Sequence, residues 1–233
     1  MDAGFLRKPR LNRGFFTQGL TMMWPFNRKT SKNTFTPPSL DEIKKRARIL
    51  VIDDNDFAYE PLFKRDGYTV EKWDDIQSLE KLENNFYDLI LLDIQGVGQA
   101  ESEEEGFGIL KHIRSQSPAQ IVIAFSNADW SLKYQQFFDL ADRKLAKSQD
   151  YVEFKRTVDE LLAQRFNPEF YINKIENLGT LSSSEKTRII EAARSSMIIG
   201  DVTPTKNSTK GLSKEDAQLV IAVIQTAIAV MTI

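Results

Sequence analysis

Polar side chains that can do chemistry stand at the ends of four apolar runs in this sequence. In chain order they are Asp53-Asp54, Asp93, Ser126 and Lys147. Three carboxylates brought close together repel one another and favour a hard divalent cation with oxygen ligands, such as Mg²⁺. A lysine ammonium and a serine hydroxyl beside them would bind a phosphoryl group. With the metal and the lysine neutralising the charge, one carboxylate can act as a nucleophile and form an acyl phosphate.

These side chains meet only if the apolar runs are parallel strands of one sheet. The runs are short and apolar, and segments with helical periodicity separate them. The expected strands are 48–52, 68–73, 88–93, 120–125 and 143–146, and the expected helices are 56–66, 75–84, 106–116, 130–140 and one that begins near Tyr151. This order predicts an α/β fold, a doubly wound five-stranded parallel sheet with helices on both faces. The carboxyl ends of such strands converge on one crevice, so the polar residues are expected to lie together.

The composition excludes several other kinds of site. The chain has no cysteine, which excludes a disulfide framework, a thiol nucleophile and zinc held by thiolates. The single histidine, His112, excludes a histidine-rich metal site and argues against a Ser-His-Asp triad. The net charge of −2 argues against a protein that is basic throughout and coats nucleic acid. Carboxylate, hydroxyl and lysine chemistry remains.

Residues 47–165 resemble the receiver domain of response regulators in two-component signalling, a flavodoxin-like fold. The segments that carry the resemblance are Ile52-Asp53-Asp54, Leu91-Leu92-Asp93-Ile94, Phe125-Ser126, Lys147 and the helix-like stretch 105–114. The resemblance covers about half of the chain. It implies a cytoplasmic signalling protein with no enzymatic activity apart from phosphotransfer to Asp93 and dephosphorylation there.

The resemblance also implies a role for each site residue. Asp93 would accept phosphate from a histidine kinase or phosphotransfer protein. The metal ligands would be Asp53, Asp54, Asp93 and the backbone carbonyl of Gln95, holding Mg²⁺. Ser126 would donate a hydrogen bond to the phosphoryl group, and Lys147 would pair with it. The phosphorylated protein would then act on a downstream protein target, with a homodimer as a further possibility.

The sequence departs from the family pattern in two places. The loop after Asp93 is long, lacks the common proline and carries acidic residues up to Glu105, which could slow phosphorylation, attract a basic partner or simply be solvated. Lys144 stands where the family often has a switch Tyr or Phe, and Ser148 replaces the usual proline after Lys147. The aromatic candidates to replace this switch residue are Phe125, Trp130 and Tyr134. We expect that the protein can still be phosphorylated but that its signalling output differs from that of the family.

Residues 166–233 are expected to form an α-helical output or dimerisation extension. Helices are expected from Pro168 to about residue 177 and over 185–199, followed by a polar linker over 200–211 and a last helix capped by Ser213. The last helix is apolar nearly all round from Ala217, but this run is shorter than the roughly 20 residues of a membrane span, so we expect it to be buried. No basic recognition helix is evident, which makes DNA an improbable partner.

Residues 1–46 form a basic leader, with ten Lys or Arg and three Asp or Glu. Its mixture of Gly, Pro, Asn and scattered aromatics has no sustained period and predicts a mostly disordered segment. It lacks the apolar stretch of a secretory signal. Residues 24–29 could make a weak contact with an anionic membrane or a partner, but a solvated tail is the favoured interpretation. Met22 or Met23 is an alternative start to Met1.

Two other functions fit parts of the pattern. A phosphohydrolase of the haloacid dehalogenase type would use Asp54 and Asp56 as its D-x-D pair, with Ser126-Asn127 and Lys147, but it would leave Asp93 without a role. A degenerate receiver would act as an interaction scaffold without phosphorylation. An adduct on Asp93 separates the first hypothesis from both alternatives.

Overall fold

The computed structural model describes residues 37–127 and 135–231, which fall within one compact unit over residues 35–233. Its centre is a five-stranded sheet in the order β2-β1-β3-β4-β5, with every neighbouring pair parallel. The strands are β1 Arg48–Ile52, β2 Thr69–Trp73, β3 Leu89–Leu92, β4 Ile121–Ser126 and β5 Arg143–Ala146. The predicted doubly wound fold is confirmed, and the strand order is the flavodoxin-like one. The order reverses between β1 and β3, which is where such a sheet opens a crevice.

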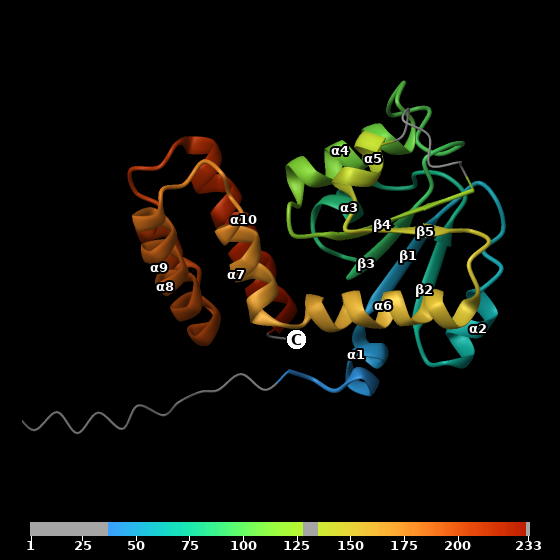
Figure 1. The fold of residues 1–233 in the computed structure, drawn as a ribbon, viewed down its shortest axis with the longest axis horizontal. Coiled ribbons are helices and arrows are strands. Elements are labelled where there is room, and N and C mark those ends of the chain that lie inside the picture. The colour runs from blue at the N-terminus through green and yellow to red at the C-terminus, as the bar shows by residue number, and fades with distance from the viewer. Residues whose placement is uncertain (1–36, 128–134, 232–233) are drawn as a thin grey trace, which may run out of the picture. The chain divides into compact units, whose positions relative to one another are not determined.

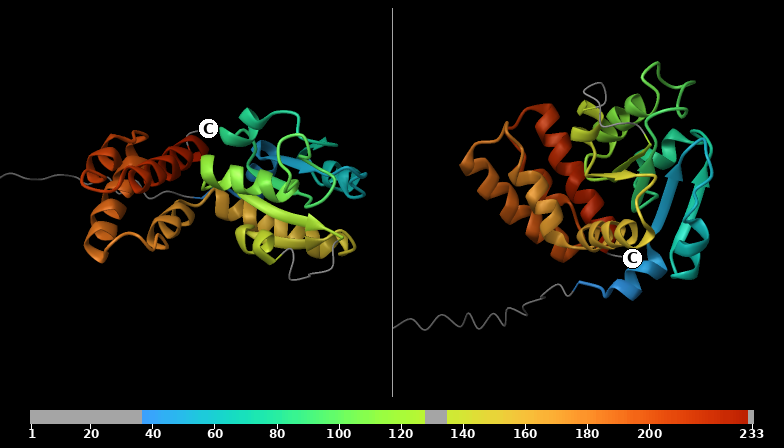
Figure 2. Two further views of the ribbon diagram at one scale, coloured as in Figure 1. Left: turned by 90° about the horizontal axis from the view of Figure 1, so that it is seen from above. Right: turned by 45° about the vertical axis from the view of Figure 1, so that its right-hand side comes forward.

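Two layers of helices cover the sheet, as Figure 1 shows. One layer contains α1 Leu40–Arg46, α2 Glu60–Arg65 and α6 Tyr151–Arg165, and the other contains α3 Leu79–Glu83, α4 Gly106–Gln116 and α5 Gln135–Leu140. Along β1, Ile49 and Val51 pack in the first layer, whereas Leu50 and Ile52 pack in the second. This alternation of buried side chains explains why the strands are continuous apolar runs. The turned views of Figure 2 show the strands running between the two layers.

Helix α1 lies inside the segment that the sequence analysis assigned to a mostly disordered leader. The Ser39 side chain accepts from the backbone N–H of Glu42, and the Glu42 carboxylate accepts from the Ser39 backbone N–H, which is a complete capping box. Ile43 is buried in the layer that contains α6. The ordered fold therefore begins before residue 47. Residues 24–29 and the alternative starts lie outside the described residues.

The C-terminal extension is helical, as predicted, but it contains one helix more than expected. Its helices are α7 Pro168–Glu176, α8 Ser183–Ile199, α9 Thr203–Ser208 and α10 Lys214–Met231. Helix α9 replaces the predicted polar linker over 200–211, because Thr205 is buried and its hydroxyl donates to Ser196 Oγ at 2.8 Å. The apolar last helix is buried as expected, with Ile224 packed in the same cluster as Ile172 and Ile189. Among the described residues, no helix has the length and hydropathy of a membrane span.

Side-chain contacts join this extension to residues that precede the strands of the sheet. Arg165, at the end of α6, is fully buried and donates to the Ala119 carbonyl at 3.0 Å. The Tyr171 hydroxyl donates to the Arg165 carbonyl at 2.9 Å. Lys174 Nζ on α7 lies 3.1 Å from a carboxylate oxygen of Asp142, which precedes β5. Buried polar contacts of this kind fix the position of α7 against the residues they reach.

Candidate functional site

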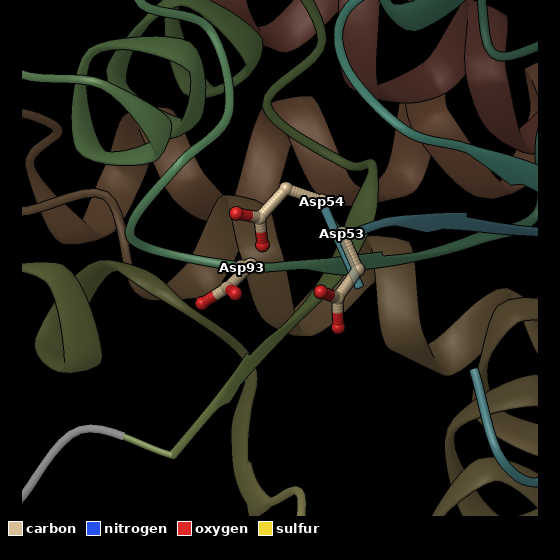
Figure 3. Close-up of side chains that lie close together, drawn as sticks. All are labelled: Asp53, Asp54 and Asp93. Carbon is tan, nitrogen blue, oxygen red and sulfur yellow. The ribbon is translucent and has the colours of Figure 1, made fainter. Parts of the chain in front are cut away.

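The candidate site is built on the carboxyl ends of the two central strands β1 and β3. Asp53 directly follows β1 and Asp93 directly follows β3, and the last residues of these strands, Ile52 and Leu92, are paired in register. Asp53 and Asp93 are buried, whereas Asp54 is exposed. One carboxylate oxygen from each of these three aspartates lies within 4.8 Å of the other two. Figure 3 shows the three side chains gathered at this edge of the sheet.

Lys147 connects the two buried aspartates. It directly follows β5, and its ammonium donates to Asp93 Oδ2 at 2.5 Å and to Asp53 Oδ1 at 2.8 Å. Burial raises the pKa of Asp93 and outweighs the lowering effect of the lysine charge. For Lys147, burial alone would lower the pKa, but the hydrogen bonds and charges of Asp53 and Asp93 raise it overall. The lysine therefore remains charged at neutral pH and offsets part of the repulsion between the carboxylates.

The turn after β1 is held by a residue that the sequence analysis did not select. The backbone N–H of Asn55 donates to Asp53 Oδ1 at 2.9 Å, and its side-chain amide donates to Asp54 Oδ1 at 2.5 Å. Lys72 Nζ donates to the Asp53 carbonyl at 2.8 Å. The carboxylate of Asp93 is oriented by the backbone N–H of Ile94, which donates to its Oδ1 at 2.6 Å. The Asp and Asn residues here are typical of an Asx turn, so the sequence could have predicted the turn. An Asx turn by itself does not indicate a function.

Two glycines lie where the backbone passes close to the aspartates. A Cβ on Gly96, whose φ is +80°, would lie 2.4 Å from Asp54 Oδ2. A Cβ on Gly106, at the start of α4, would lie 2.0 Å from the Asp93 carbonyl oxygen. Glu105 completes the arrangement, because its Oε2 accepts from the Gly96 N–H at 3.1 Å. At Gly106 the facing atoms are backbone, so only glycine permits this approach, whereas at Gly96 it is the positive φ that favours glycine. The long loop after Asp93 is thus folded back beside the site.

The remaining predicted site residues lie at the expected strand ends. Ser126 is the buried last residue of β4, and its carbonyl accepts from the Lys147 backbone N–H at 3.3 Å. Gln95 is exposed two residues after Asp93, and its N–H lies 3.5 Å from Asp93 Oδ1. Asp56 is exposed and is not a member of the carboxylate cluster within the described residues. The polar residues that end successive apolar runs in the sequence thus lie along one edge of the sheet.

The chemistry of this carboxylate cluster fits a divalent cation. Its donors are hard oxygens from Asp53, Asp54 and Asp93, which suit Mg²⁺. Asp53 Oδ2 is buried and accepts no hydrogen bond among the described residues, although the Lys147 ammonium lies 2.8 Å away. A buried carboxylate oxygen with an ion pair but no well-aligned hydrogen bond can also take a metal ion as its partner. A cation at this position would therefore share Asp53 with the Lys147 ammonium.

Phe125 belongs to the core. Its ring packs edge-on against Phe57 at 5.8 Å and Phe154 at 5.4 Å, measured between ring centroids, and only 3% of the residue is exposed. The ring of Phe125 also lies 5.7 Å from Lys147 Nζ. Swinging this ring out would open the core beneath α6, which argues against its use as a switch. The other two aromatic candidates, Trp130 and Tyr134, lie outside the described residues.

The acidic loop after Asp93 has internal structure. The backbone N–H of Ser102 donates to the Gly98 carbonyl at 2.9 Å, and the Glu104 carboxylate pairs with Lys111 at 2.8 Å. Beside Gln95, the loop lines a cavity of about 450 Å³ together with Phe107 of α4. The lining of this cavity includes Glu103, Glu104 and Glu105, so its surface is acidic.

Among known proteins, the chain resembles solved structures that cover about half of its length. No family model matches it, and no curated protein matches it. A CheY-like response regulator receiver domain protein from Methanospirillum hungatei is 27% identical, covering 51% of this chain and 95% of its own, with a TM-score of 0.42. The receiver domain of a sensor histidine kinase from Pseudomonas aeruginosa, with a magnesium ion in its active-site cleft, is 23% identical, covering 50% and 97%, with a TM-score of 0.43. The chemotaxis protein CheY4 of Vibrio cholerae is 21% identical, covering 49% and 98%, with a TM-score of 0.40. Each of these receiver-type structures covers about half of the chain, and the rest of the chain is not assigned.

Proposed function

We propose that this protein is a phosphorylation-controlled response regulator that accepts phosphate on Asp93. The observation that supports the proposal is the cluster at the switch point of the sheet, where oxygens of Asp53, Asp54 and Asp93 lie within 4.8 Å of one another. Lys147 reaches both buried members of this cluster. A nucleophilic carboxylate, a set of oxygen ligands and a fixed cation are the groups that phosphoryl transfer to an aspartate requires.

In the proposed reaction, a carboxylate oxygen of Asp93 attacks phosphorus and forms an acyl phosphate. The bond between phosphorus and the donor breaks at the same centre, and the donor leaves with the bonding electron pair. For a kinase or phosphotransfer protein the donor atom is a histidine nitrogen. Lys147 already lies 2.5 Å from Asp93 Oδ2 and would pair with a phosphoryl oxygen, and Ser126 would donate a hydrogen bond to another.

The metal ligands in this proposal are the carboxylates of Asp53, Asp54 and Asp93 and the backbone carbonyl of Gln95. When bound, Mg²⁺ would supply the positive charge that offsets these carboxylates and the phosphoryl oxygens. The turn at Asn55 orients the first two carboxylates, so their geometry is set before any ligand arrives. The proposal thus assigns the buried Asp53 a binding role in addition to its ion pair with Lys147.

Phosphorylation by a small donor tests this proposal. The purified protein is incubated with acetyl phosphate and Mg²⁺, and the product is examined by intact mass and by its stability in acid and base. We expect one added phosphoryl group that survives acid and is lost in mild base, as an acyl phosphate requires. Omitting Mg²⁺ and adding a chelator should prevent the adduct. An adduct that forms equally on Asp93→Ala would refute the assignment of Asp93.

Two lysine variants provide a matched control. Lys147→Met removes the ammonium that bridges Asp53 and Asp93, so the adduct should form more slowly or not at all. Lys144→Met removes the same charge from within strand β5, which Lys147 directly follows, and the Lys144 ammonium lies 4.8 Å from the ring centroid of Phe138. This second variant should be phosphorylated at the wild-type rate. Equal loss in both variants would point to a general effect of strand β5.

The same preparation separates the two alternatives. A phosphohydrolase of the haloacid dehalogenase type would turn over a generic aryl phosphate and lose that activity in Asp54→Asn or Asp56→Asn. The structure favours the receiver proposal over this one, since Asp56 is exposed and Asp93 takes its place in the cluster. A degenerate receiver would give no adduct, and Asp93→Ala would keep full activity in cells.

A further inference from the structure

A second polar cavity lies among residues that precede the strands, away from the carboxylate cluster at their other ends. Its volume is about 670 Å³, within the range of small-molecule sites. One wall comes from residues around the start of β1 and the loop before β3, and the other from α10 and the end of α6. The residues that matter to its chemistry are Arg46, Arg48, Glu83, Asp88, Phe166 and Val230. No group of the site proposed above lines it.

Two arginines in this cavity have guanidinium N–H groups that donate no hydrogen bond to the described residues. The Arg48 guanidinium lies over the ring of Phe86, 4.0 Å from its centroid, and makes no hydrogen bond or ion pair with the described residues. The Arg46 guanidinium lies over the ring of Phe166 at 4.5 Å and donates one hydrogen bond, to the Val230 carbonyl at 2.5 Å. Stacking on a ring holds a guanidinium in place while its N–H groups remain available.

The acidic residues of the cavity are already paired with other groups. The Glu83 carboxylate lies 2.7 Å from His112 Nε2. One oxygen of Asp88 accepts from the Arg48 backbone N–H at 2.9 Å, and the other lies 3.7 Å from Nε of the buried Arg165. The charge of Asp88 is therefore balanced by Arg165, whereas the partner of Glu83 is a histidine that is charged only when protonated. Arg46 and Arg48 thus exceed by one charge the lining carboxylates that have no cationic partner.

From this arrangement we infer that the cavity binds a small organic anion, a phosphate-bearing molecule of about nucleotide size. Two held guanidiniums suit a phosphate because each can donate two parallel hydrogen bonds to its oxygens. Phe166, Ala222 and Ala229 supply apolar surface for an organic body, and an inorganic anion alone would leave most of the volume empty. The inference goes beyond the proposed function, since it concerns a different part of the fold.

Such a ligand would act on the position of the C-terminal extension. Arg48 begins the central strand β1, whereas Ala229 and Val230 belong to α10. A molecule bound to both would stabilise the arrangement in which they line one cavity, by an amount that grows with the logarithm of its concentration relative to its Kd. Ligand binding and phosphorylation would then be two separate inputs to one chain.

Calorimetric titration with defined probes tests the inference. The full chain is titrated with AMP, glucose 6-phosphate, inorganic phosphate and adenosine, in a buffer that contains a chelator so that metal-bound phosphate at the carboxylate cluster does not contribute. We expect one site per chain for at least one of the two organic phosphates, with weaker binding of inorganic phosphate and adenosine. Raising the salt concentration should weaken the binding, because the contact is ionic. No saturable binding of either organic phosphate at millimolar concentration would overturn the inference.

Three variants locate the binding. Arg48→Ala should weaken the binding of the organic phosphate at least tenfold, whereas Arg188→Ala, which removes an exposed arginine from α8, should leave it unchanged. Ala229→Phe keeps both arginines but fills the cavity from an exposed position on α10, so it should also abolish binding. Circular dichroism checks that each variant is folded. Binding that survives both Arg48→Ala and Ala229→Phe would show that the anion binds elsewhere.

Discussion

Gly106 is the residue that brings helix α4 into contact with the strand end that carries Asp93. A Cβ at this position would lie 2.0 Å from the Asp93 carbonyl oxygen and 3.1 Å from the Ile94 Cα. Both of these are backbone atoms, so no side chain can move aside to make room. The first turn of α4 and the proposed phosphoacceptor are therefore held at a separation that only glycine allows.

We expect Gly106→Ala to destabilise the protein and to disturb Asp93. Forcing a methyl group against fixed backbone has the character of overpacking, so the free energy of unfolding should fall by about 3 kcal/mol. Gly179→Ala is the control, because a Cβ there would meet nothing within 4 Å. That variant should change the stability by less than about 1 kcal/mol. Urea denaturation measures both values, and equal stability of the two variants would contradict the argument.

At the residue scale, the charged residues of the candidate site could be predicted from the sequence, but the residues that position them could not. Asp53, Asp93 and Lys147 follow apolar runs, and the convergence of parallel strands predicts that they meet. The roles of Asn55 and Gly106 depend on the conformation of a turn and on the approach of a helix from elsewhere in the chain. Those features arise from tertiary packing, and no local spacing of residue types specifies them.

At the scale of elements, Asp142 joins three parts of the fold. Its carboxylate accepts from the Val122 backbone N–H at 2.9 Å and pairs with Arg114 of α4 at 2.7 Å and Lys174 of α7 at 3.1 Å. Burial alone would raise the pKa of Asp142, but the charges of Arg114 and Lys174 and the hydrogen bonds lower it overall. Asp142 is thus ionised in the folded protein and links strand β4 to helices on two sides.

We expect Asp142→Asn to lower the free energy of unfolding at pH 7 by about 3 kcal/mol, since it leaves two cations without their partner. The folded pKa of Asp142 is depressed below its ordinary 3.8, so its contribution is complete above that value and is lost as the pH falls through the folded pKa. The difference between wild type and variant should therefore stay constant from pH 7 to about pH 5 and shrink as the pH falls below 3.8. Urea denaturation across this range provides the measurement.

Asp139→Asn is the matched control for this prediction. Asp139 is exposed on α5, and its partner is the side-chain amide of Gln135 at 2.6 Å. We expect its removal to change the stability by about 0.5 kcal/mol or less. A difference for Asp142→Asn that stays constant down to pH 3 would mean that its carboxylate is not the group responsible.

Helices with an apolar face could be predicted from the sequence, whereas the short helices α1 and α9 could not. Helix α4 has the predicted bounds of 106–116 because its face of buried Leu110 and Ile113 repeats at helical spacing. Helix α9 was expected to be a linker, since its Thr, Pro, Lys, Asn and Ser residues have no apolar period. It forms because Thr205 is buried against Ser196 of α8, a contact between segments rather than a property of either one.

At the scale of the whole molecule, Arg165 couples the sheet domain to the helical extension. It ends α6, is fully buried, and donates to the Ala119 carbonyl before β4 at 3.0 Å and to Asn85 Oδ1 at 3.4 Å. Its carbonyl accepts from Tyr171 of α7. A buried guanidinium that reaches loops on one side and a helix on the other makes the two regions depend on each other.

We therefore expect Arg165→Ala to weaken both regions. Removing this guanidinium leaves Asp88 without its nearest cation and leaves a cavity, so the free energy of unfolding should fall by about 3 kcal/mol or more. Hydrogen exchange followed by mass spectrometry should show loss of amide protection in α7 and also in the segment that precedes β4. The control is Arg156→Ala on the exposed face of the same helix, paired with Glu153 and Glu160, which should cost about 1 kcal/mol or less. Loss of protection confined to α6 would mean that the sheet and the extension are stabilised independently of Arg165.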